Sequence, residues 1–271
     1  MVRTPTPHSP LAPKARKRFG QNFLVDQGII RQIARVIGAT DKDHLVEIGP
    51  GHGAITELLV SACRRLDVVE IDRDLIPMLR VRFEKHPQFH LHNVDALQFQ
   101  FANLVDANSK ALRVVGNLPY NISTPLIFHL LRSHQHIIDM HFMLQKEVVN
   151  RLAAAPGDKA YGRLSVMTQY YCQVEALFDV PPQSFSPAPK VDSGIVRLSP
   201  YTVLPEQAED FSCFEHTVRT AFQQRRKTLR NSLKTILADM DEQQLPFSLN
   251  CRAEELSVHH YVQLANHLTA S

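Results

Sequence analysis

The spacing of apolar residues alternates along residues 27–154 between the three-to-four-residue repeat of a helix and the short continuous runs of a buried strand. Helical spacing predicts helices at Gln27–Ile37, Thr56–Ala62, Asp74–Lys85, Thr124–Leu131 and Glu147–Ala154. Apolar runs predict strands at His44–Ile48, Leu66–Ile71, Phe89–His92, Leu112–Val115 and Ile137–Leu144. Strands and helices that alternate in this way predict an α/β fold with a doubly wound, mostly parallel sheet.

The pattern changes in the second half of the chain. Val174–Val180 and Gly194–Leu198 are predicted strands on either side of a proline-rich loop, and we expect them to add an antiparallel edge to the sheet. From about Pro205 the spacing is helical to the end of the sequence. Three apolar stripes predict helices there: Phe211, Phe214, Val218 and Phe222; Leu229, Leu233, Ile236 and Leu237; and Leu256–Leu268. We therefore expect a flexible arm at 1–25, an α/β domain at 26–202 and a small all-helical domain at 203–271.

The composition is that of an ordinary globular protein, with 44% hydrophobic and 21% charged residues, which excludes a disordered or collagen-like chain. No apolar run approaches the roughly 18 residues of a membrane-spanning helix. The cysteines lie far apart, which disfavours a disulfide framework or a zinc site and favours a reducing compartment. The first residues lack the apolar segment of a secretory signal, and their prolines would break the helix of a mitochondrial one. We expect a cytoplasmic protein.

Positive charge is concentrated in two acid-free clusters, although the net charge is only +3. The first cluster holds Arg3, Lys14, Arg16, Lys17 and Arg18, and the second holds Arg225, Arg226, Lys227, Arg230 and Lys234. Such clusters are candidate contacts for a polyanion, with an ordinary solvated surface as the alternative. Arg226, Arg230 and Lys234 repeat every four residues beside an apolar stripe, which predicts an amphipathic helix with one basic face.

A glycine-rich loop follows the first strand of the predicted sheet. Gly49, Gly51 and Ala54 match the G-x-G-x-x-A pattern of nucleotide-binding turns, in which glycine lets a ligand approach the backbone. Glu70, at the end of the second strand, is placed to bind a ribose diol. A dinucleotide, another nucleoside ligand or a purely structural turn remain possible on this pattern alone.

Acidic residues at three successive strand ends help to choose between these ligands. A pyrophosphate about 5 Å from the Glu47 carboxylate would be repelled by roughly 3 kcal/mol at an effective dielectric constant of about 20. S-adenosylmethionine carries no phosphate, and its amino group and sulfonium are cationic. Asp95, after the third strand, could accept a hydrogen bond from the adenine amino group, although a helix cap is the commoner role for such a residue. Glu47, Glu70 and Asp95 together favour the methyl donor over NAD.

The segment Gly116–Ser123 carries an Asn-x-Pro-aromatic sequence after the fourth strand. The amine of adenine is a poor nucleophile because its lone pair is delocalised into the ring. The side-chain oxygen of Asn117 and the carbonyl of Leu118, aimed at its hydrogens, would direct that lone pair at a methyl group. Pro119 would fix the turn, and Tyr120 would offer a ring for stacking a flipped base, worth about 1–3 kcal/mol. The alternative is a proline turn with a half-buried tyrosine.

These motifs, in this order, resemble the small-subunit ribosomal RNA dimethyladenosine transferases of bacteria, which are related to the erythromycin-resistance methylases. Besides the glycine loop and Asn-Leu-Pro-Tyr, the resemblance covers residues 16–24, 140–147, 187–193 and 224–228, and extends from about Arg16 to the last predicted helix. It implies a Rossmann-like class I methyltransferase sheet at 26–202 and an RNA-binding helical domain at 203–271.

The resemblance also implies roles for individual residues. Asn22 and Leu24 would contact the methionine end of the donor, Gly49 would line its pocket, and Glu70 and Asp95 would bind its ribose and adenine. Asn117 would lie where donor and target meet, beside the catalytic Leu118 and Tyr120, and Phe185 would form a second aromatic wall opposite Tyr120. A core phenylalanine at a domain junction is the alternative for Phe185. Phosphate contacts would come from Arg16, Lys17, Arg18, Arg225, Arg226, Lys227, Arg230 and Lys234.

The expected activity is dimethylation of two adjacent adenines in the 3′-terminal hairpin of 16S rRNA within the 30S particle or its precursor, by a monomer with S-adenosylmethionine and without a metal. A methylase of 23S rRNA is a close alternative, and a non-catalytic ribosome assembly factor is a more distant one. A DNA adenine methylase is less well supported, because no sequence-reading module follows the Asn-Leu-Pro-Tyr motif.

Overall fold

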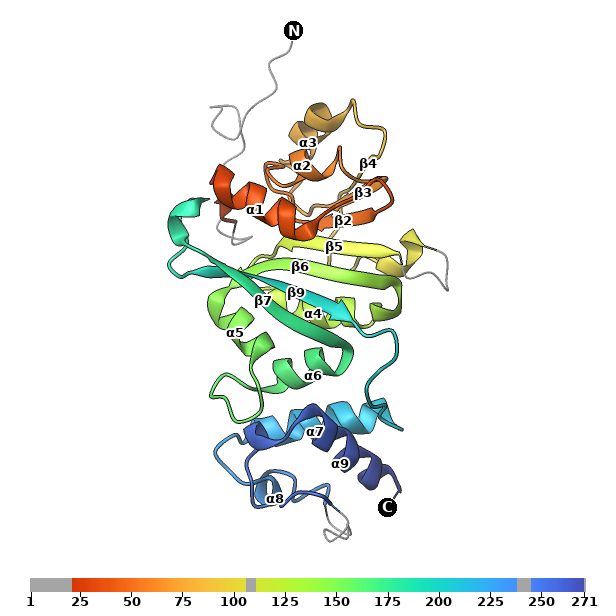
Figure 1. The fold of residues 1–271 in the computed structure, drawn as a ribbon, viewed down its shortest axis with the longest axis vertical. Coiled ribbons are helices and arrows are strands. Elements are labelled where there is room, and N and C mark those ends of the chain that lie inside the picture. Colours follow the sequence, from red (N-terminus) through yellow and green to blue (C-terminus); the bar gives the residue numbers. More distant parts are fainter. Residues whose placement is uncertain (1–20, 106–110, 238–244, 271) are drawn as a thin grey trace. The chain divides into compact units, whose positions relative to one another are not determined.

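The computed structural model describes residues 21–105, 111–237 and 245–270, and most of its strands join one seven-stranded sheet with the order β4-β3-β2-β5-β6-β9-β7 (Figure 1). The strands are β2 (His44–Ile48), β3 (Arg65–Val69), β4 (Phe89–His92), β5 (Leu112–Asn117), β6 (Ile137–Gln145), β7 (Cys172–Val180) and β9 (Ser193–Pro200). The pairs from β4 to β6 are parallel, and β9 runs antiparallel to β6. The predicted parallel sheet with an antiparallel edge is confirmed.

Helices form at the predicted places: α1 (Gln27–Ile37) precedes β2, the helices α2 (Thr56–Leu59), α3 (Ile76–Phe83) and α4 (Ser123–Leu131) lie between parallel strands, and α5 (Lys146–Ala153) follows β6. Apolar side chains of α1, α2 and α3 share one core with residues of β2 and β3. All five residues of β2 are buried, which is typical of a parallel strand covered on both faces. The α2 and α3 helices are shorter than predicted.

The limits of α1 agree with the prediction because both ends carry strong local signals. The Asp26 carboxylate accepts hydrogen bonds from the backbone N–H groups of Gly28 and Ile29, at 2.7 and 3.1 Å. Gly38 ends the helix in the left-handed conformation, with φ of 58°. Such caps satisfy backbone groups that the helix itself leaves unpaired.

Two short strands that the sequence pattern did not reveal form a separate ribbon. Strand β1 (Phe23–Leu24) pairs antiparallel with β8 (Phe185–Ser186), so that Leu24 lies opposite Phe185. The backbone N–H groups of Val25 and Asp26 both donate to the carbonyl of Ser184. The ribbon therefore joins segments about 160 residues apart, and two-residue strands carry no periodicity that could predict it.

By its internal contacts the chain divides into two compact units. The first unit contains the residues up to Val149 and Glu175–Pro200, and the second contains Asn150–Val174 and the residues from Tyr201 onward. The helices of the second unit are α6 (Arg163–Tyr171), α7 (Phe211–Gln223), α8 (Leu229–Ser232) and α9 (Val258–Ala270).

The sequence pattern predicted no helix at α6 and assigned 150–174 to the α/β domain, whereas by contacts this segment belongs with the helices. The reason lies in the aromatic packing of α6. The ring centroid of Tyr170 in α6 lies 4.6 Å from that of Phe214 in α7, and the Tyr170 hydroxyl accepts the backbone N–H of Ala208.

The prediction of a basic amphipathic helix around Arg226, Arg230 and Lys234 is wrong. Only α8, a four-residue helix, forms there. Thr228 makes an isolated antiparallel bridge with Arg252, and the backbone N–H groups of Leu229 and Arg230 donate to the carbonyls of Cys251 and Leu249. These hydrogen bonds to residues 249–252 take the place of the backbone bonds that a longer helix would make. The predicted apolar stripe nevertheless supplies two buried residues, Leu229 and Leu233.

No helix in the part of the chain described here is long and apolar enough to cross a membrane.

Candidate active site

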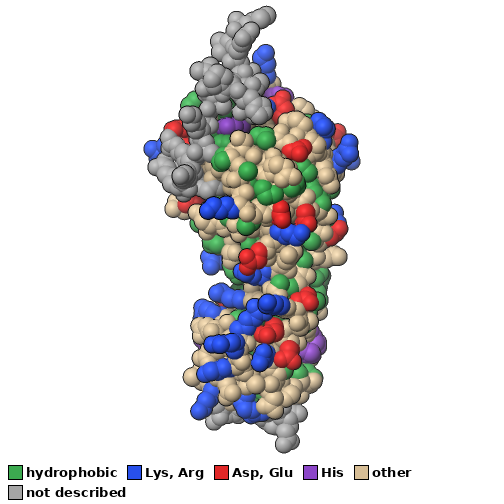
Figure 2. Space-filling view, turned by 90° about the vertical axis from the view of Figure 1, so that its left-hand side faces the viewer, with side chains coloured by type: hydrophobic (Ala, Val, Ile, Leu, Met, Phe, Trp, Pro, Cys, Tyr) green, Lys and Arg blue, Asp and Glu red, His purple; other side chains and the backbone are tan. Residues whose placement is uncertain are grey.

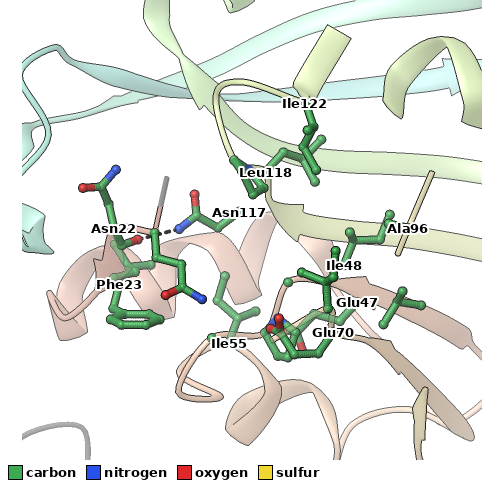
Figure 3. Close-up of a pocket in the computed structure, with 18 of the residues that line it drawn as sticks. Asn22, Phe23, Glu47, Ile48, Ile55, Glu70, Ala96, Asn117, Leu118 and Ile122 are labelled. Carbon is green, nitrogen blue, oxygen red and sulfur yellow. Dashed lines mark hydrogen bonds between the residues drawn. The ribbon is translucent and has the colours of Figure 1, made fainter. Parts of the chain in front are cut away.

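A pocket in the first unit lies at the carboxyl ends of β2, β3 and β5, where ligands of open α/β sheets usually bind (Figure 3). The sequence-predicted residues that line it are Asn22, Leu24, Gly49, Glu70, Asp95, Asn117, Leu118 and Tyr120. The structure thus brings together positions spread over about a hundred residues of sequence. It also adds residues that were not predicted for this site, among them Gln21, Phe23, His52 and Ile71.

The glycine loop after β2 forms one wall of the pocket and has a backbone that disfavours other residues. Gly49 has φ of 68° and Gly51 has φ of 58°, in the left-handed region where side chains are strained. A Cβ atom at Gly51 would also lie 2.8 Å from Cδ1 of Phe23. Ala54, the third position of the predicted pattern, lines the pocket too.

Two buried glutamates lie in the wall beside this loop. Glu47 is 2% exposed and accepts a 2.6 Å hydrogen bond from the Thr56 hydroxyl. Glu70 is 4% exposed and accepts the backbone N–H of Asp72 at 2.8 Å. Burial raises the pKa of each carboxyl to about 7, and the charge of Glu70 contributes to the rise at Glu47. At neutral pH each group is therefore only partly ionised without a ligand. The repulsion between Glu47 and a pyrophosphate is accordingly weaker than the value for a fully charged carboxylate.

Asp95 lines the pocket and caps a turn, because no helix follows it of the kind considered as its alternative. Its Oδ1 accepts the backbone N–H of Leu97 at 2.9 Å, and its carbonyl accepts that of Gln98. The carboxylate thus caps a turn after β4 while the residue lines the pocket beside Ala96.

Asn117 is the last residue of β5 and points toward the N-terminal segment (Figure 3). Its Nδ2 donates a 3.0 Å hydrogen bond to the backbone carbonyl of Asn22. A carbonyl can only accept, so this bond also fixes which end of the amide is the nitrogen. The backbone N–H of Leu118 donates to the carbonyl of Met143, which holds the turn against β6.

Tyr120 is held at two points. Its hydroxyl shares a 2.8 Å hydrogen bond with Oγ of Ser193, the first residue of β9. Its backbone carbonyl accepts the hydroxyl of Ser123 at 3.2 Å. The sequence predicted Tyr120 but no role for Ser193, because the two are 73 positions apart.

Phe185, the predicted second wall, lies in β8 opposite Leu24, is 4% exposed and belongs to the hydrophobic core. It does not line the pocket described above. This placement resembles the core phenylalanine considered as the alternative, and a stacking role for Phe185 stays a prediction.

The segment from Gln21 to Leu24 closes one side of the pocket through side-chain contacts that the sequence did not reveal. The amide of Gln21 donates to the buried carboxylate of Asp72 at 3.0 Å. The ring of Phe23 stacks on that of His52 in the glycine loop, with centroids 3.9 Å apart. Together with the bond from Asn117, these contacts tie the segment to the loop after β3, to the glycine loop and to β5.

The predicted RNA contacts fall into three groups. Arg16, Lys17 and Arg18 lie outside the described residues. Arg226, Lys227, Arg230 and Lys234 are exposed in the second unit, where Figure 2 shows Lys and Arg side chains gathered on the visible face. Arg225 is partly exposed and contacts other residues of the second unit: its Nη2 donates to the carbonyl of Lys159 at 2.6 Å, and its Nε lies 3.5 Å from the Glu254 carboxylate. We call the four exposed residues the basic cluster.

Among the described residues, no group of three or more His, Cys, Asp or Glu side chains is arranged to hold a metal ion. The absence of a metal stays a prediction.

The sheet order with antiparallel β9, together with a glycine loop and acids at the strand ends, defines a class I S-adenosylmethionine-dependent methyltransferase. A dimethyladenosine transferase from Plasmodium falciparum superposes with a TM-score of 0.72 at 26% identity, covering 89% of this chain and 95% of that one. The 23S rRNA methyltransferase ErmE has the same fold, with a TM-score of 0.73 at 24% identity, covering 92% of this chain and all of the other.

The family model of ribosomal RNA adenine dimethylases matches residues 12–270. A ribosomal RNA small subunit methyltransferase A from Saccharophagus degradans is 60% identical over 255 residues, covering 94% of this chain and 95% of the relative. A protein of the same name from Pseudomonas aeruginosa is 56% identical, with the same coverage. The chain belongs to the ribosomal RNA adenine dimethylase family and is an S-adenosylmethionine-dependent rRNA adenine dimethyltransferase.

Proposed function

We propose that this chain transfers methyl groups from S-adenosylmethionine to N6 of two adjacent adenines in the 3′-terminal hairpin of 16S rRNA, giving N6,N6-dimethyladenosines. The substrate is the 30S particle or its precursor, late in small-subunit assembly. The small subunit is supported as the target by relatives of 56–60% identity whose names specify it. In this proposal the enzyme acts as a monomer, in the cytoplasm and without a metal.

The lining of the pocket fits a cationic nucleoside better than a phosphate-bearing one. A cation beside Glu47 and Glu70 would be stabilised by their negative charge. Because the pKa of each carboxyl is about 7, a nearby cation can shift both to the ionised form at neutral pH. In our assignment Glu70 binds the ribose, Asp95 binds the adenine, and Asn22, Leu24 and Gly49 line the site of the methionine end. S-adenosylmethionine, when bound, supplies an electrophilic methyl group on its sulfonium.

The observation that carries the proposal is the hydrogen bond from Asn117 to the carbonyl of Asn22. Because the amide nitrogen is used there, Oδ1 is the Asn117 atom left to accept from the amino group of a target adenine. The carbonyl of Leu118 is the second acceptor, and the ring of Tyr120 supports the base. These groups orient the amine, and water takes the proton that the methylated nitrogen releases.

The basic cluster contacts RNA phosphates in this proposal. Such contacts position the RNA without reading its sequence, and their strength falls steeply with salt. Arg16, Lys17 and Arg18 of the N-terminal arm would act in the same way. Because Arg225 already contacts Lys159 and Glu254, we assign it a structural role in this proposal in place of the predicted RNA contact.

The proposal is tested by incubating the protein with labelled S-adenosylmethionine and undermethylated 30S particles, and by mapping the modified nucleotides. We expect two adjacent adenines near the 3′ end of 16S rRNA, each with two methyl groups. Purified 50S particles serve as the comparison, because label incorporated only there would support the 23S alternative instead. Tight binding to 30S particles without any methyl transfer would support a non-catalytic assembly factor.

A further inference from the structure

Ser193 is a buried polar residue to which the reaction described above assigns no role. It is the first residue of β9 and is fully buried, at 0% exposure. Its hydroxyl meets the hydroxyl of Tyr120 at 2.8 Å. Ser193 therefore contacts the far end of the ring on which the target base is proposed to stack.

The position of Ser193 is set by the main chain around it. It lies opposite Gln145 in the antiparallel ladder between β6 and β9. The preceding carbonyl, of Asp192, accepts the backbone N–H of Lys146 at 3.0 Å. The following residue, Gly194, lies so close to Val149 that a Cβ atom would be 3.3 Å from Cγ2 of that side chain. The Ser193 hydroxyl is thus presented from a rigid part of the sheet.

Tyr120, in contrast, follows a turn after β5. The bond from Ser123 restrains its backbone, whereas the place of its ring depends on rotation about the Cα–Cβ bond. That rotation swings the hydroxyl oxygen, the atom farthest from the backbone, through the widest arc, so the hydrogen bond to Ser193 restrains it. A stacking platform is effective only when its position is preorganised.

We propose that Ser193 is a positioning residue that holds the ring of Tyr120 in place for the extruded adenine. The inference rests on the proposed function, because it assumes that Tyr120 supports the target base. Ser193 acts through Tyr120 and touches neither donor nor target. Its loss leaves the donor pocket intact and slows methyl transfer.

The test compares single-turnover methylation of 30S particles by the wild type, Ser193→Ala, Tyr120→Phe and the double variant. Loss of one neutral hydrogen bond corresponds to an effect of about three- to tenfold. We expect each single variant to transfer methyl groups that much more slowly, with unchanged affinity for S-adenosylmethionine by calorimetry. The double variant should be no slower than the slower single one, because both changes remove the same bond. Tyr120→Phe removes it without altering β9, which guards against a folding defect in Ser193→Ala.

The matched control is Ser165→Ala, which removes another fully buried hydroxyl, one that bonds the Arg151 carbonyl in the second unit. It should leave the single-turnover rate unchanged. A 2-aminopurine at the target position reports stacking directly, and we expect its quenching in the complex to weaken in Ser193→Ala.

Three results would overturn the inference: a wild-type rate in Ser193→Ala, a double variant whose losses multiply, or an equal loss in Ser165→Ala. If the wild type methylates only 50S particles, the proposed target fails, and the same comparison on that particle still decides the role of Ser193. If it methylates neither particle, both proposals fail.

Discussion

At the scale of single residues, the side-chain amide of Asn117 links the end of β5 to the N-terminal segment of the site. Asn117 donates to Asn22 in the segment that closes the pocket, and in the proposed mechanism its oxygen accepts from the target amine. The type of side chain and its place at a strand end were predictable from the sequence. The partner was not, because nothing local indicates that a carbonyl 95 positions away satisfies the nitrogen.

The first prediction concerns this amide. Asn117→Ala should slow methyl transfer by about 10²-fold, the usual effect of removing one preorganised group that stabilises a transition state. Asn117→Asp keeps an acceptor oxygen but loses the bond to Asn22, and should fall between the alanine variant and the wild type. Single-turnover incorporation of labelled methyl groups measures the effect. A wild-type rate in Asn117→Ala would refute the assignment.

The second prediction concerns the buried carboxyl of Glu47. Because its pKa in the folded protein, about 7, lies above the ordinary value of 4.5, its contribution to stability is fully present below pH 4.5 and is lost as the pH rises through 7. Glu47→Gln keeps an acceptor for Thr56 without the charge. It should therefore stabilise the ligand-free protein by about 1–3 kcal/mol at pH 8 and by much less at pH 5. Urea unfolding at the two pH values measures this, and equal effects would contradict it.

At the scale of elements, local capping explains where prediction succeeds. Helix α1 has Asp26 at its start and Gly38 at its end, and its predicted limits agree with the structure. The segment around α8 has a similarly regular apolar repeat, but its backbone bonds to residues 249–252. A periodic pattern reports which side chains are buried, whereas tertiary hydrogen bonds decide whether the helix extends.

The third prediction separates two neighbouring arginines of this element. Arg226→Gln should weaken binding to 16S rRNA and lower the slope of log affinity against log salt by about 0.7–0.9, the value for one lost phosphate contact. Its melting temperature should not change. Arg225→Gln should lower the melting temperature and leave RNA binding and its salt slope unchanged, because Arg225 bonds Lys159 and lies near Glu254. Filter binding over a salt series and thermal unfolding distinguish them. Identical behaviour of the two variants would show that both arginines have the same role.

At the scale of the whole molecule, the pocket that we propose for the donor is assembled from loops after β2, β3, β4 and β5 and closed by the segment from Gln21 to Leu24. These parts are distant in sequence but contact one another at the pocket, so we expect a bound ligand to order them jointly. No described residue of the second unit lines this pocket.

The fourth prediction follows from this arrangement. S-adenosylmethionine at 100 times its dissociation constant should stabilise the protein by about 2.7 kcal/mol. Hydrogen exchange should slow at residues 21–25, 47–53 and 117–122, with little change in the helices α7 and α9. The affinity should rise as the pH increases toward about 7, because the cation binds best when Glu47 and Glu70 are ionised. Uniform protection of both units, or an affinity that falls over this range, would contradict the proposed pocket.

What the sequence by itself determined is the alternation of strands and helices, the glycine loop, and the acids and Asn-Leu-Pro-Tyr motif that end successive strands. These are local features, and the geometry of a parallel sheet then brings the strand ends together. Only the tertiary structure decided the β1–β8 ribbon, the bond from Asn117 to Asn22, the partner of Tyr120 and the contacts of Arg225 with Lys159 and Glu254. Each of these depends on hydrogen bonds between segments distant in sequence, where propensity and periodicity carry no information about which groups meet.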